Sequence, residues 1–124
     1  MIDFTNAIFT KMMPVKDAGF MRMVNAILIP DEELLGIYKS LRDGVVFTNK
    51  RIIAANVQGI TGKKVDLTSM PYSKVQCFSI ESAGVLDLDS ELELWFSSAG
   101  KIKFEFMGNN NLTEICRMIS TYIL

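Results

Sequence analysis

Between residue 34 and residue 106, apolar and polar positions alternate in short runs, which is the pattern of half-buried β-strands. Turn-forming residues divide this stretch into about seven strands. On either side of it, in residues 1–30 and 109–124, apolar residues recur at helical spacing. The pattern therefore predicts a mainly β domain with helices at both ends of the chain.

One predicted hairpin, in residues 44–55, carries apolar side chains on both of its faces. A two-residue turn at Asn49-Lys50 determines which residues face each other across it. The facing pairs are Val45 with Ala54 and Phe47 with Ile52 on one face, and Val46 with Ile53 on the other. A sheet that is apolar on both faces needs two covers, so we expect the N-terminal helices or a neighbouring subunit to supply the second one.

A second hairpin is predicted further along the chain, where apolar and charged residues alternate strictly. Pairing Phe96 with Ile102 sets apolar residues opposite one another and leaves residues 98–100 (Ser-Ala-Gly) as a three-residue loop. In this register Trp95 lies on the outer face of the sheet, opposite Lys103.

The first thirty residues predict one or two short helices. Phe4, Ile8 and Met12 share one helical stripe, which Pro14 would end. A second helical stretch runs from Lys16 to about Ile27. Five of the eight methionines lie in this segment, so its apolar surface suits either a cover for the sheet or a contact with a partner.

The last residues predict an amphipathic helix. Asn111 is a favoured N-cap residue, and Glu114 follows three positions later, as in a capping box. The apolar stripe consists of Leu112, Ile115, Cys116, Ile119 and Ile123. Residues 1–124 are thus expected to form one domain, with a helical extension in 1–30, barrel strands in 31–108 and a capping helix in 109–124. The architecture is a seven-stranded, partly open antiparallel barrel.

Composition excludes several kinds of chemistry. The 124 residues contain no histidine, which removes the usual general base and the commonest metal ligand, and the two cysteines alone do not complete a zinc site. A formal net charge of -1 argues against nucleic-acid binding. No leader and no long apolar stretch is evident, so we expect a cytoplasmic protein with reduced thiols. Because the usual catalytic and metal-binding residues are missing, we also expect no enzymatic activity and no metal or other cofactor.

Two segments carry a resemblance to a known family. They are the hairpin GVVFTNKRII, residues 44–53, and the segment PYSKVQCFSIESAGVLDLDSELELW, residues 71–95. Together they resemble the bacterial pleckstrin-homology (PH)-like domain family. The resemblance implies seven antiparallel strands followed by a capping helix, and a tendency to assemble into ring-like homo-oligomers. It implies no established ligand or reaction.

Aromatic residues and methionines are the candidates for an oligomer or partner interface, where both are enriched. The candidates are Trp95, Tyr72, Met12, Met13, Met21 and Met23. A second interpretation is that they lie beneath the chain's own helices. For the methionines a third is insertion into a membrane surface, for which the segment offers few basic residues.

Charged residues suggest two further sites. Lys39, Arg42, Lys50 and Arg51 are the candidates for contact with a phosphate or an anionic lipid headgroup. Acidic residues recur at every second position at Asp87, Asp89, Glu91 and Glu93. Leu92 and Ser98 stand where an EF-hand needs glycine and glutamate, so we expect a solvated strand face neutralised by Lys101 and Lys103.

The sequence favours a non-enzymatic interaction or scaffold module that self-associates into a ring-like homo-oligomer and presents a surface to a protein or peptide partner. The alternative is a module that binds lipid headgroups or phosphate, which would place a cytoplasmic protein at the periphery of a membrane. Nucleic acid is not expected as a partner.

Overall fold

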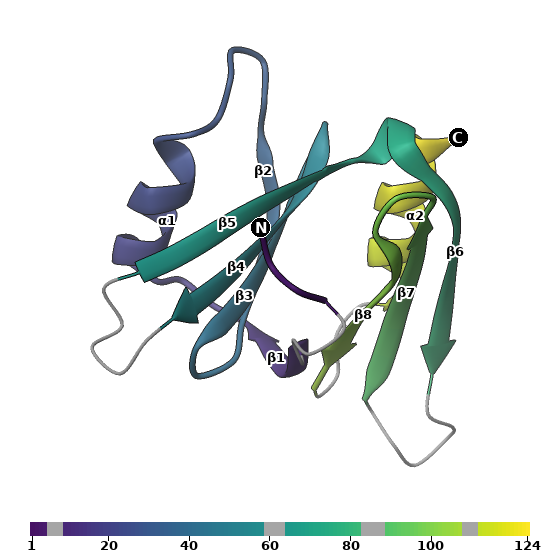
Figure 1. Ribbon diagram of the computed structural model, residues 1–124, viewed down its shortest axis with the longest axis horizontal. Helices are drawn as coiled ribbons and strands as arrows, with labels where there is room; N and C mark the ends of the chain where they lie inside the picture. Colours follow the sequence, from purple (N-terminus) through teal and green to yellow (C-terminus); the bar gives the residue numbers. More distant parts are fainter. Residues whose placement is uncertain (5–8, 59–63, 83–88, 108–111) are drawn as a thin grey trace.

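The computed structural model describes residues 1–4, 9–58, 64–82, 89–107 and 112–124 (Figure 1). In these ranges eight strands form one curled sheet in the order β5-β4-β3-β2-β1-β8-β7-β6. The elements are β1 (Phe9–Pro14), α1 (Ala18–Asn25), β2 (Leu34–Lys39), β3 (Asp43–Thr48), β4 (Arg51–Gln58), β5 (Lys64–Pro71), η1 (Tyr72–Lys74), β6 (Val75–Ser82), β7 (Ser90–Phe96), β8 (Gly100–Phe106) and α2 (Leu112–Ile123). The sheet curls so that β2–β5 face β6–β8 across the core.

The first predicted helix is wrong, because residues 9–14 form strand β1, which raises the strand number from seven to eight. β1 pairs antiparallel with β2 and parallel with β8, and so joins the two halves of the sheet. Phe9, which is outside the predicted helical stripe, and Met12 are both buried. Lys11 between them has φ 53°, and the register shifts there, which lets the side chains of Phe9 and Met12 both enter the core. Ile8 of the predicted stripe lies outside the described residues.

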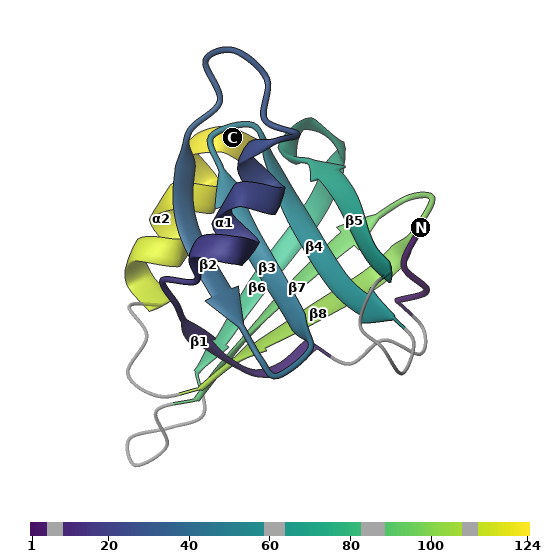
Figure 2. The same cartoon turned by 90° about the vertical axis from the view of Figure 1, so that its left-hand side faces the viewer.

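The predicted register of the β3–β4 hairpin is confirmed, and α1 covers its outer face (Figure 2). Phe20 and Val24 of α1 form a second buried cluster with Val46, Ile53 and Ala55. The second predicted helix is therefore confirmed within shorter bounds, and it supplies the expected second cover.

Asp17 and Gly44 explain how α1 is seated on the sheet. The Asp17 carboxylate caps the helix by accepting a hydrogen bond from the Phe20 amide at 3.0 Å. At Gly44 a Cβ atom would lie 2.9 Å from Cζ of Phe20 and 3.1 Å from the carbonyl oxygen of Tyr38. Only glycine therefore lets the Phe20 ring approach β3 this closely.

The β7–β8 hairpin forms, but the predicted register is wrong by two positions. Ile102 faces Leu94 instead of Phe96, and Phe96 faces Gly100. Gly100 has φ 77°, so the residue suited to a left-handed conformation ends a turn at residues 97–99. A shift of two keeps every side chain on its predicted face, so Trp95 stays on the outer face but lies opposite Lys101.

Helix α2 contributes to the main core and confirms the predicted C-terminal helix over residues 112–123. Ile119 is fully buried, and α2 contacts η1 and β6. The predicted N-cap Asn111 lies outside the described residues, as do the side chains of Leu112 and Ile115. The curled sheet with a helix at its open end is the predicted architecture.

Candidate functional site on the outer face of β6, β7 and β8

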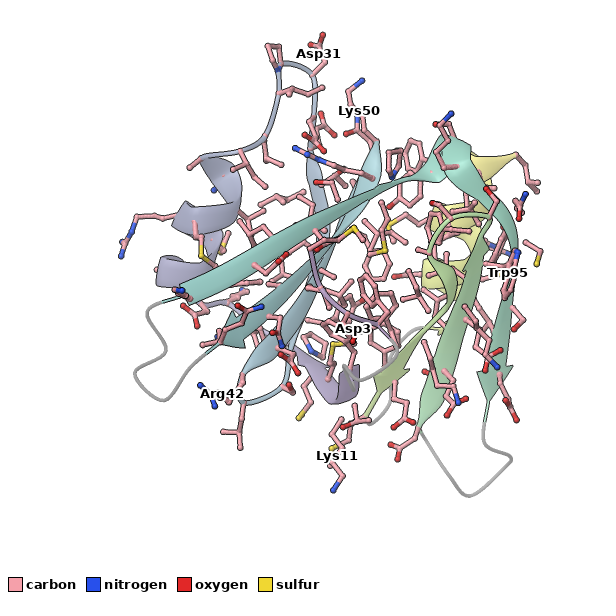
Figure 3. The ribbon with its side chains drawn as sticks, in the orientation of Figure 1. Asp3, Lys11, Asp31, Arg42, Lys50 and Trp95 are labelled. Atoms are coloured by element: carbon pink, nitrogen blue, oxygen red, sulfur yellow. The ribbon has the colours of Figure 1, made fainter. Side chains whose placement is uncertain are left out.

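The outer faces of the two sheet halves differ in their cover. α1 lies over the half made by β2–β5, whereas α2 contacts η1 and β6 and contributes to the core. The outer side chains of β6, β7 and β8 point away from the core, as Trp95 does in Figure 3. Within the described ranges, no helix covers this surface, which we call the outer face of β6–β8.

Strand registers arrange this face in three rows across the neighbouring strands. The first row is Cys77, Trp95 and Lys101, the second is Ser79, Glu93 and Lys103, and the third is Glu81, Glu91 and Glu105. The face therefore changes from aromatic and basic at one end to acidic at the other.

Trp95 dominates the first row. Its side chain is 45% exposed, although tryptophan is usually well buried. A hollow of about 190 Å³, formed with Cys77, Phe78 and Lys101 among others, lies beside the ring. An exposed indole beside a shallow hollow is the kind of anchor that protein interfaces use.

Lys103 partly neutralises the middle of the face. Its Nζ lies 3.6 Å from an oxygen of Glu91 and 3.7 Å from an oxygen of Glu93. These long, exposed pairs stabilise the fold little. The expected neutralisation of this strand face is therefore seen for Lys103, whereas Lys101 faces Trp95 instead. Asp87 of the predicted series lies outside the described residues.

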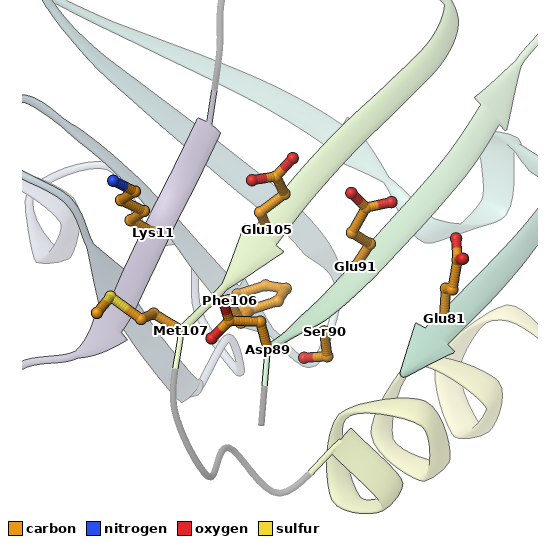
Figure 4. Close-up of a pocket in the computed structure, with 8 residues that line it drawn as sticks. All are labelled: Lys11, Glu81, Asp89, Ser90, Glu91, Glu105, Phe106 and Met107. Carbon is orange, nitrogen blue, oxygen red and sulfur yellow. The ribbon is translucent and has the colours of Figure 1, made fainter. Parts of the chain in front are cut away.

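Glu81, Glu91 and Glu105 form what we call the acidic row. With Lys11, Asp89 and Met107 they line a hollow of about 300 Å³ at the end of the strands (Figure 4). Burial and the adjacent carboxylate of Glu91 raise the pKa of Glu105. In the part of the chain that the structure describes, no group of three acidic or cysteine side chains is placed to hold a metal ion.

Sequence reasoning found Glu91 and Asp89 but missed the acidic row itself. Glu81 and Glu105 join Glu91 only through pairing on both sides of β7, and the predicted register of β7–β8 would have placed another residue opposite Glu91. The alternating charges on each strand were visible, but which charges face each other depends on the register.

Two of the candidate interface residues are inside the molecule. Tyr72 is only 2% exposed, and its hydroxyl donates a hydrogen bond to the Thr48 carbonyl at 2.7 Å. Met12 is fully buried in the core. The expectation that they form a contact surface is therefore wrong, because both side chains complete the core.

The remaining methionines do not gather at Trp95. Met13 is about half exposed on β1, and Met21 and Met23 are partly buried on α1. Met23 packs against the cluster beneath α1. Since α1 lies on the other half of the sheet, the methionines and Trp95 do not form one surface.

The four candidate phosphate-binding residues also separate into two pairs. Lys39 and Arg42 lie at the β2–β3 turn, and Lys50 and Arg51 lie at the β3–β4 turn, at opposite ends of β3 (Figure 3). Lys39 is ion-paired with Asp17 at 2.9 Å. The four residues therefore do not surround a single phosphate. Lys50 and Arg51 lie at the β3–β4 turn, away from Lys39 and Arg42.

Arg51 forms an ion pair with Glu32, a residue that was not among the predicted site residues. The guanidinium donates to both carboxylate oxygens, at 2.8 and 2.9 Å, and the Glu32 side chain is fully buried. Burial alone would raise the pKa of Glu32, but hydrogen bonds from Arg51, Thr48 and the Ile29 amide lower it below its usual value. This contact ties the α1–β2 connection to the β3–β4 turn.

A curled, mostly antiparallel sheet with a C-terminal helix at its open end defines a protein of the pleckstrin-homology-like fold class. The family model described as "Bacterial PH domain" matches residues 3–123, and the chain belongs to this family. Among the described residues, no helix is long and apolar enough to cross a membrane.

Relatives and solved structures agree with this assignment. Uncharacterized protein YjqA of Bacillus subtilis (strain 168) is 40% identical over 96 residues, which cover 76% of this chain and 77% of that protein. A DUF1696 family protein with a pleckstrin-homology domain, from Shewanella loihica PV-4, has a TM-score of 0.79 and 34% identity, covering 93% of this chain and 99% of that one. A pleckstrin homology domain from Shewanella amazonensis SB2B has a TM-score of 0.65 and 37% identity, covering 96% and 93%. These matches establish the fold and indicate no enzymatic family.

Proposed function

We propose that this chain is a non-enzymatic interaction module that self-associates into a homo-oligomer through the outer face of β6–β8. The observation that carries the proposal is Trp95, a large aromatic side chain that stands 45% exposed on a sheet face with no helix over it in the described residues. Tryptophan is among the residues that most often supply the binding energy of an interface.

The distribution of apolar surface supports this choice of face. α1 already buries the apolar outer side of β3 and β4, so that surface needs no second subunit. Trp95 and the hollow beside it have no such cover within the described chain. A ring-like assembly requires this contact, or a second one, to repeat around a closed rotation axis. A protein or peptide partner would use the same exposed indole.

Light scattering of the purified chain at micromolar concentration tests the proposal. We expect a mass above that of one chain, and we expect Trp95→Glu to weaken the association at least tenfold, since removing one anchor residue costs about 2 kcal/mol. Leu41→Glu makes the same kind of change at a side chain that is 99% exposed on the β2–β3 turn and should leave the mass unchanged. A monomeric wild-type chain would contradict self-association.

Leu41 is also the observation that favours the alternative function, binding to a lipid headgroup or phosphate. It is fully exposed beside Arg42 at a turn, and an apolar tip next to basic residues suits a membrane surface. Co-sedimentation with anionic and with neutral vesicles at low salt tests it, and absence of pelleting with anionic vesicles excludes it.

A further inference from the structure

The sheet ends in two edge strands, β5 and β6, which differ in how far their edges are protected. Along β5, the Ile2 amide donates a hydrogen bond to Oγ1 of Thr68, and the Ile2 side chain is buried. β5 also ends in Pro71, which has no N–H to donate. Both features make β5 poorly suited to pair with a further strand.

β6 lies at the other margin of the sheet and has no comparable protection (Figure 1). It contains neither lysine nor proline, and after an irregularity at Gln76 it pairs regularly with β7 from Cys77 to Ser82. Among the described residues, residues 77–81 make no backbone hydrogen bond outside the β6–β7 ladder, to α2 or to any other element. The N–H and C=O groups on the free side of β6 are therefore open to another strand.

The side chains of β6 indicate what a further strand would add. Phe78 and Ile80 pack against the main core but stay only partly buried. Cys77, Ser79 and Glu81 are exposed on the opposite face. A strand added beside β6 would supply backbone partners and cover the free sides of Phe78 and Ile80.

The sequence of β6 is self-complementary about Ser79. Residues directly opposite one another in an antiparallel pair share a face, so a twofold axis at Ser79 sets Phe78 of one copy against Ile80 of the other. On the exposed face the same register sets Cys77 against Glu81. An axis at Phe78 or at Ile80 would instead place one of these two apolar side chains opposite a polar residue. The apolar pattern therefore favours the axis at Ser79.

We propose that β6 pairs antiparallel with β6 of a second copy of this chain, with the twofold axis at Ser79. The contact goes beyond the proposed function, because it uses the edge of the sheet and not its outer face. It joins β6–β8 of the two copies into one continuous layer, with both Trp95 side chains on the same face. The outer-face contact through Trp95 stays available in this arrangement.

Disulfide cross-linking tests the position of the axis. Cα atoms of opposite residues in an antiparallel pair lie about 4.5–5.5 Å apart, which is within the range for a disulfide. We expect Ser79→Cys in a Cys77→Ser background to form cross-linked dimers at least tenfold faster than Ser73→Cys in the same background. Ser73 is exposed on η1, outside β6, so that variant measures chance collision.

A second cross-link tests the register. Glu81→Cys should form a disulfide with Cys77 of the other copy, so its dimer should form at least tenfold more slowly in a Cys77→Ser background. Within one chain, positions 77 and 81 are about 13 Å apart along the strand, which is too far for an internal disulfide. Equal rates in the two backgrounds would overturn this register.

Sedimentation equilibrium tests the contact without a cross-link. Ser79→Lys places two ammonium groups beside each other at the axis, so we expect association at least tenfold weaker than that of the wild-type chain. Ser73→Lys adds the same charge outside β6 and should leave the mass unchanged. Circular dichroism confirms that each variant is folded.

The outcomes separate the edge contact from the proposed function. Cross-linking of Ser79→Cys at the rate of Ser73→Cys, or wild-type association in Ser79→Lys, would overturn the edge contact, while an association weakened by Trp95→Glu would still support the outer face. We expect the Ser79→Cys cross-link to form in a Trp95→Glu chain as well. Its loss there would contradict the edge contact, because the pairing of β6 does not use Trp95.

Discussion

Glu32 shows how a single buried carboxylate joins distant parts of the chain. Arg51 donates two hydrogen bonds to it, the Thr48 hydroxyl donates a third at 2.8 Å, and the Ile29 amide a fourth at 3.1 Å. Every partner is a donor, so the ionised form is stabilised despite burial. The carboxylate therefore contributes to stability only while it is charged.

We expect Glu32→Gln to lower the free energy of unfolding by about 2 kcal/mol at pH 7, because it removes charge-assisted hydrogen bonds and leaves Arg51 without its counter-charge. The folded-state pKa of Glu32 is depressed, so this contribution is present above the pKa of the unfolded chain and is lost as the pH falls through the folded-state pKa. Urea denaturation of both proteins across the acidic pH range measures the difference.

Glu33→Gln is the matched control, since that side chain is exposed. It should change the unfolding free energy by less than about 0.5 kcal/mol. A difference between wild type and Glu32→Gln that stays constant down to the lowest pH at which both fold would contradict the assigned charge state.

Tyr72 and Trp95 show where the burial of a single aromatic side chain can be predicted from sequence and where it cannot. Tyr72 and Trp95 were equal candidates for a contact surface. The 3-10 turn η1 places the Tyr72 side chain in the core, where its hydroxyl donates a hydrogen bond to the Thr48 carbonyl. Strand alternation instead places Trp95 on the outer face of the sheet. Alternation is readable from sequence, but the path of a connecting turn is not.

Among the elements, the two hairpins differ in how well their sequences define the register. The two-residue Asn49-Lys50 turn leaves one way to pair β3 with β4, and that register was predicted correctly. The β7–β8 connection has several small residues in succession. Registers that differ by two positions bury the same side chains there, so the apolar pattern does not distinguish them.

Strand β1 was missed for a different reason. Residues 9–14 contain no regular alternation, because the irregular backbone at Lys11 lets Phe9 and Met12 both enter the core. The segment is a strand only because β2 and β8 each offer it an edge. Such tertiary pairing overrides the local helical spacing of its apolar residues.

The contact between α1 and β3 gives a prediction for Gly44. A methyl group at this position would lie 2.9 Å from the Phe20 ring and 3.1 Å from a backbone oxygen, so either α1 or the β2–β3 pairing must shift. We expect Gly44→Ala to lower the free energy of unfolding by about 2 kcal/mol. Thermal or urea denaturation measures it.

Gly19→Ala provides the matched control within α1. A Cβ atom there meets its nearest neighbour, an oxygen of Asp17, at an ordinary 3.5 Å. Alanine is favoured over glycine in a helix by up to about 1 kcal/mol, so this variant should be as stable as wild type or more so. Equal effects of the two substitutions would refute the close packing of Phe20 on β3.

On the scale of the whole molecule, the closure of the barrel at β1 bears on how the chain folds. The hairpins β3–β4 and β7–β8 join residues that are near in sequence, whereas β1 pairs Phe9 with Phe104, which is close to the other end of the chain. Bringing such distant residues together carries the larger loop-closure entropy. We therefore expect the local hairpins of the two halves to form first. The pairing of β1 with β8 should form late, at the step that limits the folding rate.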